Sequence, residues 1–180
     1  MAEEPQEAAE PTEESSEGGP EQTDPETLER IVTLAFGGDV AKYDEFVARL
    51  RAVIPDDGEV ILRGSAVTGK RGEDGAPFDA DGPGTSDLDV TFVGGGMTQY
   101  WMGFYLPGMH TLPLSEEHPN ACPHFVPLRD ELCEFVGRPV NIQATSSLVQ
   151  FARDVMMRQP YFKMIHKRGD GAEAVESVQQ

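Results

Sequence analysis

Two aspartates, Asp87 and Asp89, stand one residue apart at the start of an apolar run that ends at Val93. Side chains alternate between the two faces of a strand, so both carboxylates are predicted to lie on the same face. Two carboxylates held that close raise each other's pKa unless a cation lies between them. Mg²⁺, or Mn²⁺ in its place, suits such an all-oxygen site, and Mg²⁺ normally also binds substrate phosphates.

A second polar pair, Gly64-Ser65, follows the apolar segment 59–63. A turn of this kind offers backbone N–H groups and a hydroxyl, both of which can bind phosphate oxygens. Lys70 and Ser86 are further candidates for nucleotide contacts, because they flank the loop that joins the two segments. The sequence therefore predicts a site for a metal ion and a phosphorylated ligand between two neighbouring strands.

The segment from Gly64 to Lys70 also fits the spacing of a phosphate-binding P-loop. Two features count against this interpretation. Arg71 stands where a P-loop needs Ser or Thr for Mg²⁺, and the Gly and Pro residues of 72–77 cannot open the helix that a P-loop requires. The two aspartates also precede their apolar strand, whereas the partner aspartate of a P-loop ends one.

Gly-Ser after one strand, followed by Ser86-Asp87-Leu88-Asp89 before the next, resembles the signature of the DNA polymerase beta-like nucleotidyltransferases. The resemblance covers roughly residues 40–150. It implies that Asp87 and Asp89 bind Mg²⁺ and that Ser65 contacts the terminal phosphates of a nucleoside triphosphate such as ATP. An acceptor hydroxyl on a small molecule, a protein or an RNA end would attack the α-phosphate in line and release pyrophosphate.

The resemblance extends to the segment 137–142, which matches the family pattern Gly-Arg-x-Val-Asp-hydrophobic except that Asn141 replaces the aspartate. In the family this aspartate is the third carboxylate and helps to deprotonate the attacking hydroxyl. An amide cannot accept a proton at neutral pH. Asn141 therefore predicts a different base, or slow or absent catalysis, and the candidate bases are Glu59, Asp79 and Asp81. The alternative function is a catalytically degenerate module that binds nucleotide or a partner protein.

The composition indicates one domain with an acidic appendage. Residues 1–26 contain ten Asp or Glu and no Lys or Arg, so they contribute −10 of the formal net charge of −18. Such a segment cannot bury enough apolar surface to fold. We therefore expect a disordered tail at 1–26, a nucleotidyltransferase-like domain at 27–168 and a frayed end at 169–180.

Charge and hydropathy restrict the partners and the location. The core carries about −8, the difference between −18 and −10, and this acidity disfavours binding to duplex DNA. No apolar run approaches the roughly 20 residues of a membrane span, and the two cysteines suggest no disulfide framework, so a cytoplasmic protein is predicted. Family members of this size are commonly dimers, so a homodimer or a separate helical partner subunit is expected.

The elements that must position these residues alternate between helix and strand, which predicts a mixed α/β domain with a small sheet flanked by helices. Helices are expected from the start signal Asp24-Pro25 to residue 36, at 39–54 and 127–136, and from 148 onward to include Tyr161 to Ile165. Strands are expected at 59–63, 87–93 and 139–144. The Gly- and Pro-rich segment from Lys70 to Gly84 is predicted to be a loop, longer than the family's usual connection.

Four residues of the zinc-ligand type lie within sixteen positions, namely His118, Cys122, His124 and Cys133. Their spacing matches no zinc-binding pattern. The interpretation that the pattern favours is therefore loop histidines together with a half-buried thiol.

Overall fold

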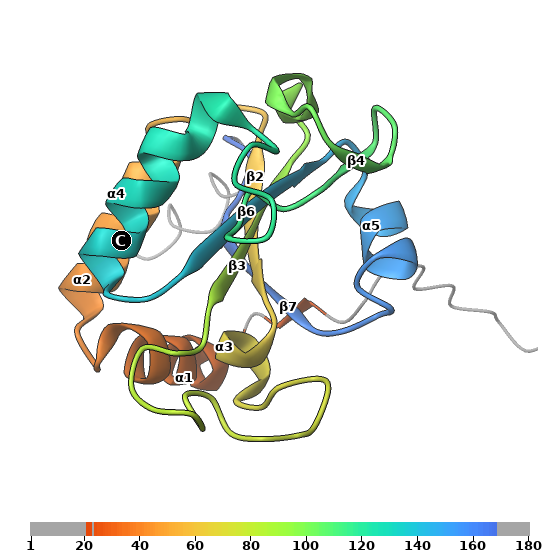
Figure 1. Cartoon of the computed structure of the whole chain (residues 1–180). Helices are drawn as coiled ribbons and strands as arrows, with labels where there is room; N and C mark the ends of the chain where they lie inside the picture. Colours follow the sequence, from red (N-terminus) through yellow and green to blue (C-terminus); the bar gives the residue numbers. More distant parts are fainter. Residues whose placement is uncertain (1–20, 23, 169–180) are drawn as a thin grey trace, which may run out of the picture.

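The candidate residues lie on a mixed sheet that has seven strands among the described residues, in the order β1-β7-β2-β3-β6-β5-β4 (Figure 1). The computed structural model describes residues 21–22 and 24–168 of the chain. Helices flank the sheet, so the α/β prediction is confirmed. Within the described part of the chain, no helix is long and apolar enough to cross a membrane.

The three central strands carry the candidate site. β2 (Glu59–Arg63) runs antiparallel to β3 (Leu88–Val93), and β3 runs parallel to β6 (Val140–Thr145). The sequence predicts each of these strands to within one residue. Their apolar runs form strands because they are short, bounded by turn residues and buried on both faces of the sheet.

Shorter strands extend the sheet on both sides. β7 (Tyr161–Ile165) runs antiparallel to β2, and β1 (Glu21–Gln22) pairs with β7 in parallel. On the other side, β5 (His110–Thr111) is antiparallel to β6, and β4 (Phe104–Leu106) is antiparallel to β5. The last two strands fall in the segment 97–124, to which the sequence pattern assigns no element.

The prediction that Tyr161 to Ile165 continue the last helix is wrong, because this segment is strand β7. Its side chains alternate between the two faces of the sheet: Tyr161 packs in the cluster of one face, whereas Phe162 and Met164 pack in the cluster of the other. Pro160 separates it from α5 (Leu148–Asp154), since a proline disfavours helical backbone in the residue before it.

Two of the helices begin at aspartates that cap their free backbone N–H groups. The Asp24 carboxylate accepts a hydrogen bond from Thr27 N at 2.8 Å and caps α1 (Pro25–Phe36), and Asp39 caps α2 (Val40–Arg51) in the same way. The other elements are α3 (Ser65–Thr68), α4 (Val126–Val136) and the 3₁₀ turns η1 (Met97–Tyr100) and η2 (Pro123–Phe125).

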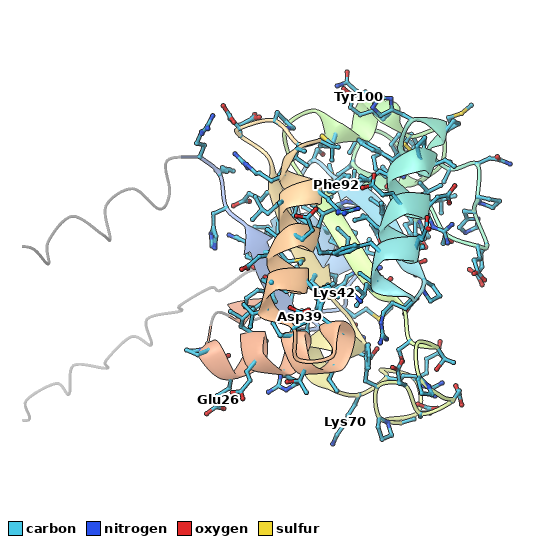
Figure 2. All side chains as sticks on the ribbon, turned by 90° about the vertical axis from the view of Figure 1, so that its left-hand side faces the viewer. Glu26, Asp39, Lys42, Lys70, Phe92 and Tyr100 are labelled. Carbon is cyan, nitrogen blue, oxygen red and sulfur yellow. The ribbon has the colours of Figure 1, made fainter. Side chains whose placement is uncertain are left out.

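The domain has three layers. Figure 1 shows α2 and α4 side by side on one face of the sheet, with α1 at its lower end and α5 on the opposite face. The main core lies under α1, α2 and α4, where Phe92 points between the helices in Figure 2. A smaller core, which includes Ile61 and Phe151, lies under α5. The odd-numbered residues of β3 and β6 face α5, and these include Asp89 and Asn141.

The predicted boundary of the tail is too late in the chain. Glu21–Gln22 pair with β7, and Asp24 and Pro25 begin α1, so folded structure starts before residue 27. The signal for this start is present in the sequence, because Asp followed by Pro is a typical beginning of a helix. The rest of the predicted tail, residues 1–20 and 23, and the predicted frayed end at 169–180 lie outside the described residues.

Candidate functional site

Asp87, Asp89 and Asn141 lie together on the face of the sheet that α5 covers in part. Asp89 and Asn141 are direct partners in the parallel pairing of β3 and β6. The amide Nδ2 of Asn141 donates to Asp87 Oδ2 at 2.5 Å and to Asp89 Oδ1 at 3.1 Å. The three side chains that the motifs single out therefore meet at one point.

Gly64 brings the end of β2 against the carboxylate of Asp89. Its backbone has φ +81° and ψ −156°, a conformation that side chains disfavour. A Cβ atom at this position would lie 2.9 Å from Asp89 Oδ2. Glycine is needed here both for the backbone conformation and for the close approach, and it starts the single turn α3 with Ser65 as its first residue.

Arg63 is a neighbour of the aspartates that the motif analysis does not single out. It is the cross-strand partner of Asp89 in the β2–β3 pairing, and its guanidinium lies 3.6 Å from Asp89 Oδ1. The same guanidinium donates to Gln143 Oε1 at 2.6 Å. The only sequence signal for this contact is that Arg63 and Asp89 each lie at the polar end of an apolar strand.

The carboxylate of Asp87 is in an environment that disfavours its charge. Burial raises the pKa of Asp87 most, and the nearby charge of Asp89 raises it further. The hydrogen bond from Asn141 and the charge of Arg63 act in the opposite direction but do not cancel the rise. A bound cation would favour the ionised form of Asp87, as the sequence pattern predicts.

The contacts of Asn141 test whether these residues fit a metal ion. Its amide group supplies a donor that both aspartates share, so an electropositive group already lies between the two carboxylates. A half-turn of the amide would present Oδ1 instead, and carboxylate and amide oxygens are ligands that Mg²⁺ accepts. Among the described residues, no group of three or more His, Cys, Asp or Glu side chains forms a metal site. Two carboxylates and one amide therefore fit a hard cation, with one charge fewer than three carboxylates would give.

A cleft of about 460 Å³ opens beside these residues. Its lining includes Ser65, Asp87 and Asn141. Two loops supply most of the other lining residues, namely Arg71, Asp81, Thr85 and Ser86 from one loop and Pro113, Ser115, Glu116 and Glu117 from the other. The cleft therefore combines Asp87 and Asn141 with hydroxyl groups and with an excess of acidic side chains, whereas Asp89 is not among its lining residues.

The nucleotide-binding candidates have different surroundings. Ser65 and Ser86 line the cleft, although the Ser86 hydroxyl also accepts a hydrogen bond from Asp79 N at 2.8 Å. Lys70 is exposed, is not among the residues that line the cleft, and points away from the domain in Figure 2. The residue that follows it, Arg71, lines the cleft in its place.

The three candidate bases are separated by the fold. Glu59 lies at the far end of β2 and pairs with Lys163 at 3.3 Å. Asp79 is held by Arg138, with contacts of 3.0 and 3.1 Å. Only Asp81 lines the cleft. The carboxylates of Glu116 and Glu117 also line it, and sequence reasoning missed them because they come from a segment without a recognisable pattern.

The arrangement differs from a P-loop. The helix after Gly64 is a single turn that ends at Gly69, and β2 is antiparallel to the strand that carries the aspartates. A P-loop needs a long helix directly after its phosphate-binding turn. The single-turn helix and the antiparallel pairing therefore agree with the prediction that this segment is not a P-loop.

The residues of the zinc-ligand type have other partners. Cys122 Sγ donates to Tyr100 O, the His124 ring stacks on Tyr100, and Cys133 Sγ accepts from Val140 N. These contacts favour a packing role for Cys122, His124 and Cys133, as the sequence pattern does.

Comparisons with known proteins leave the site to be judged on its geometry. No protein-family model, no curated protein and no solved structure matches the chain. The resemblance to the nucleotidyltransferases therefore depends on the motif residues and on the contacts described above.

Proposed function

We propose that this chain is a Mg²⁺-dependent nucleotidyltransferase, which moves a nucleoside monophosphate from a nucleoside triphosphate to an acceptor hydroxyl. The observation that carries the proposal is the convergence of Asp87, Asp89 and Asn141, which share one amide donor at 2.5 and 3.1 Å. Asp87 and Asn141 line a cleft of about 460 Å³ together with Ser65, and Asp89 adjoins them without lining it. This combination of carboxylates, hydroxyl groups and an open volume supports binding of a metal–triphosphate complex.

Each residue has a role in this proposal. Asp87 and Asp89 would hold Mg²⁺ or Mn²⁺, which when bound would neutralise phosphate charge and activate the α-phosphate. The Ser65 hydroxyl donates to a phosphate oxygen, and Gly64 allows the close approach of β2 to Asp89. Asn141 orients the two carboxylates.

The attacking hydroxyl must transfer its proton to a group in the cleft. Asn141 cannot accept it. The lining carboxylates other than Asp87 are Asp81, Glu116 and Glu117, and we propose that one of these acts as the base. General bases contribute about 10²–10⁴-fold to rates, so replacing the correct one should slow the transfer by that factor without weakening nucleotide binding equally.

We further propose that the protein works in the cytoplasm. A nucleotidyltransferase needs nucleoside triphosphates, and the chain's two cysteines, Cys122 and Cys133, are free thiols, as in most cytoplasmic proteins. A homodimer or a helical partner subunit would complete the surface that binds the acceptor, which one small domain offers only in part.

One observation favours a second function, a module that binds nucleotide or a partner protein without catalysis. Asn141 donates hydrogen bonds to both aspartates and so satisfies them with a neutral group. In such a module the cleft would bind metal and nucleotide, but no base would activate an acceptor.

Transfer of a radiolabelled α-phosphate distinguishes the two functions. The protein is incubated with each labelled nucleoside triphosphate, Mg²⁺ or Mn²⁺ and a cell extract, and labelled products are separated. The enzyme predicts a labelled product that the Asp87→Ala, Asp89→Ala double variant does not form. The matched control removes two exposed acids from α4, with Asp130→Ala and Glu134→Ala, and should retain activity. Nucleotide binding without transfer would support the module. The absence of both would refute the enzyme and the nucleotide-binding form of the module.

A further inference from the structure

The loop 70–86 between α3 and β3 is tied to the rest of the domain by hydrogen bonds, an ion pair and a buried aromatic ring. Asp79 has φ +58° and accepts hydrogen bonds from Gly84 N at 3.0 Å and Ser86 N at 2.9 Å. Both oxygens of Asp79 also bind the buried guanidinium of Arg138. Phe78 is buried beneath the same guanidinium, which lies 4.6 Å from its ring centroid. These contacts fix the path of the loop along the cleft.

Arg71 is the basic residue among those that this loop contributes to the cleft. Its guanidinium lies 2.7 Å from Asp81 Oδ2, and both side chains line the cleft together with Ser65 and Asp87. The backbone of Arg71 is fixed by a hydrogen bond from its N–H to Ala76 O at 2.8 Å. The Nε atom of Arg71 is buried and has no hydrogen-bond partner among the described residues. The contact that holds the guanidinium at the cleft is therefore the ion pair with Asp81.

The charges around the cleft make this arginine important for an anionic ligand. Four carboxylates line the cleft, and Arg71 is the only Lys or Arg among its lining residues. A triphosphate with one bound Mg²⁺ still carries net negative charge, which these carboxylates repel. A guanidinium presents its donors in a planar fork that matches the oxygens of a phosphate group.

We propose that Arg71 binds the terminal phosphate of the nucleoside triphosphate and that Asp81 holds the guanidinium in place when no nucleotide is bound. This inference rests on the proposed function, and it adds the group that selects a triphosphate over a diphosphate. It assigns to Arg71 the phosphate contact that the sequence predicts for Lys70. The long loop 70–86 then contributes to nucleotide binding, because it carries Arg71, the Lys or Arg that lines the otherwise acidic cleft among the described residues.

The test measures the affinity of ATP, GTP, ADP and GDP, each with Mg²⁺, for the Arg71→Gln variant by calorimetric titration. A charge-assisted hydrogen bond to a partly exposed arginine corresponds to about a tenfold change in affinity. We expect Arg71→Gln to weaken triphosphate binding by about that factor and to change diphosphate binding by less than about threefold.

Arg51→Gln is the matched control. Arg51 and Asp56 form an ion pair on α2 and the turn after it, with side chains 32% and 67% exposed, compared with 33% and 70% for Arg71 and Asp81. The control removes the same charge from an equally exposed ion pair outside the cleft. Its affinity for triphosphates should equal that of the natural protein.

Asp81→Asn provides a change of opposite sign. Asp81 competes with the phosphate for Arg71, so Asp81→Asn should tighten triphosphate binding by a few-fold. This gain should shrink when Arg71→Gln is also present, because no guanidinium is then left to release. A gain of equal size in both backgrounds would mean that Asp81 acts only through its own charge, and would count against the proposed competition.

The outcomes separate this inference from the proposed function. If the natural protein binds triphosphates and this binding is lost on Asp87→Ala, an unchanged affinity in Arg71→Gln overturns the role of Arg71 alone. If the natural protein binds neither ATP nor GTP, the titration is repeated with CTP and UTP, and the absence of binding to all four triphosphates would overturn the proposed function and the inference together. Circular dichroism of each variant shows whether the fold is retained. If Arg71→Gln does not fold, the Arg71→Lys variant is titrated in its place. A triphosphate affinity equal to that of the natural protein would then overturn the proposal that the planar guanidinium of Arg71 binds the terminal phosphate.

Discussion

Replacing Asn141 with aspartate is a severe test of the contacts among Asp87, Asp89 and Asn141, because it exchanges a shared donor for a third negative charge. Two hydrogen bonds to charged acceptors are lost, worth about 1.5–3 kcal/mol each. The new oxygen would replace a nitrogen that lies 2.5 Å from Asp87 Oδ2 and 3.1 Å from Asp89 Oδ1. At about 3 Å and an effective dielectric constant of about 20, repulsion between two unit charges amounts to about 5–6 kcal/mol.

Proton uptake limits this loss of stability. One protonated carboxyl supplies one O–H donor where the amide supplied two N–H donors, and protonation costs about 1.4 kcal/mol for each pH unit above a pKa of about 4. We therefore expect Asn141→Asp to lower the free energy of unfolding by about 2–4 kcal/mol near pH 7. The folded variant binds more protons than its unfolded state, so this loss should shrink by up to about 3 kcal/mol between pH 7 and pH 5. Excess Mg²⁺ should reduce it at neutral pH, because a cation between the carboxylates favours their ionised forms.

Urea unfolding in EDTA and in excess Mg²⁺, at several values of pH, measures these effects. The single tryptophan, Trp101, is buried and reports unfolding by its fluorescence. Asn120→Asp makes the same chemical change at an exposed position and should alter the free energy of unfolding by less than about 0.5 kcal/mol. A loss in Asn141→Asp that is absent at neutral pH, or independent of both pH and Mg²⁺, would refute the placement of Asn141 between the two carboxylates.

Three further predictions concern stability. Asp87→Asn should raise the thermal midpoint in EDTA at neutral pH. Burial and the charge of Asp89 raise the pKa of Asp87, so the natural protein loses stability as pH rises through that pKa. An unchanged midpoint would contradict this prediction. Burial lowers the pKa of His110, so stability should fall as pH drops below about 6.5. The variant His110→Asn should flatten this dependence. Urea unfolding of both proteins between about pH 7 and pH 5 measures the difference. Gly64→Ala should lower the free energy of unfolding by about 1–3 kcal/mol, and by more than Gly38→Ala does. Gly38 is the matched control, because it has φ +82° but no atom within 4 Å of an added Cβ. Equal losses would show that contact with Asp89 adds nothing.

The meeting of the motif residues follows from local rules that can be read in the sequence. The two-residue period of a strand places Asp87 and Asp89 on one face, and turn residues bound each apolar run. The pattern does not state that β3 and β6 pair in register with Asp89 opposite Asn141. That register is expected only from the resemblance to nucleotidyltransferases, in which the third carboxylate belongs to the same site.

The contacts that sequence reasoning missed depend on residues far apart in the chain. Arg63 and Gln143 are 80 positions apart, and Arg138 and Asp79 are 59 positions apart. Neither pairing has a local signal, since each requires the sheet order to be known. The expectation that Tyr161 to Ile165 form helix failed for a related reason, because strand β7 is defined by its pairing with β2.

The most direct test of the proposed site is the change in thermal midpoint on addition of ATP or GTP with Mg²⁺. A ligand that binds only the folded state raises the midpoint. The natural protein should therefore unfold at a higher temperature with Mg²⁺ and nucleotide than with nucleotide in EDTA. The Asp87→Ala, Asp89→Ala double variant should show no such rise. Equal rises in both proteins, or no rise in the natural protein, would contradict a metal–triphosphate site at these residues.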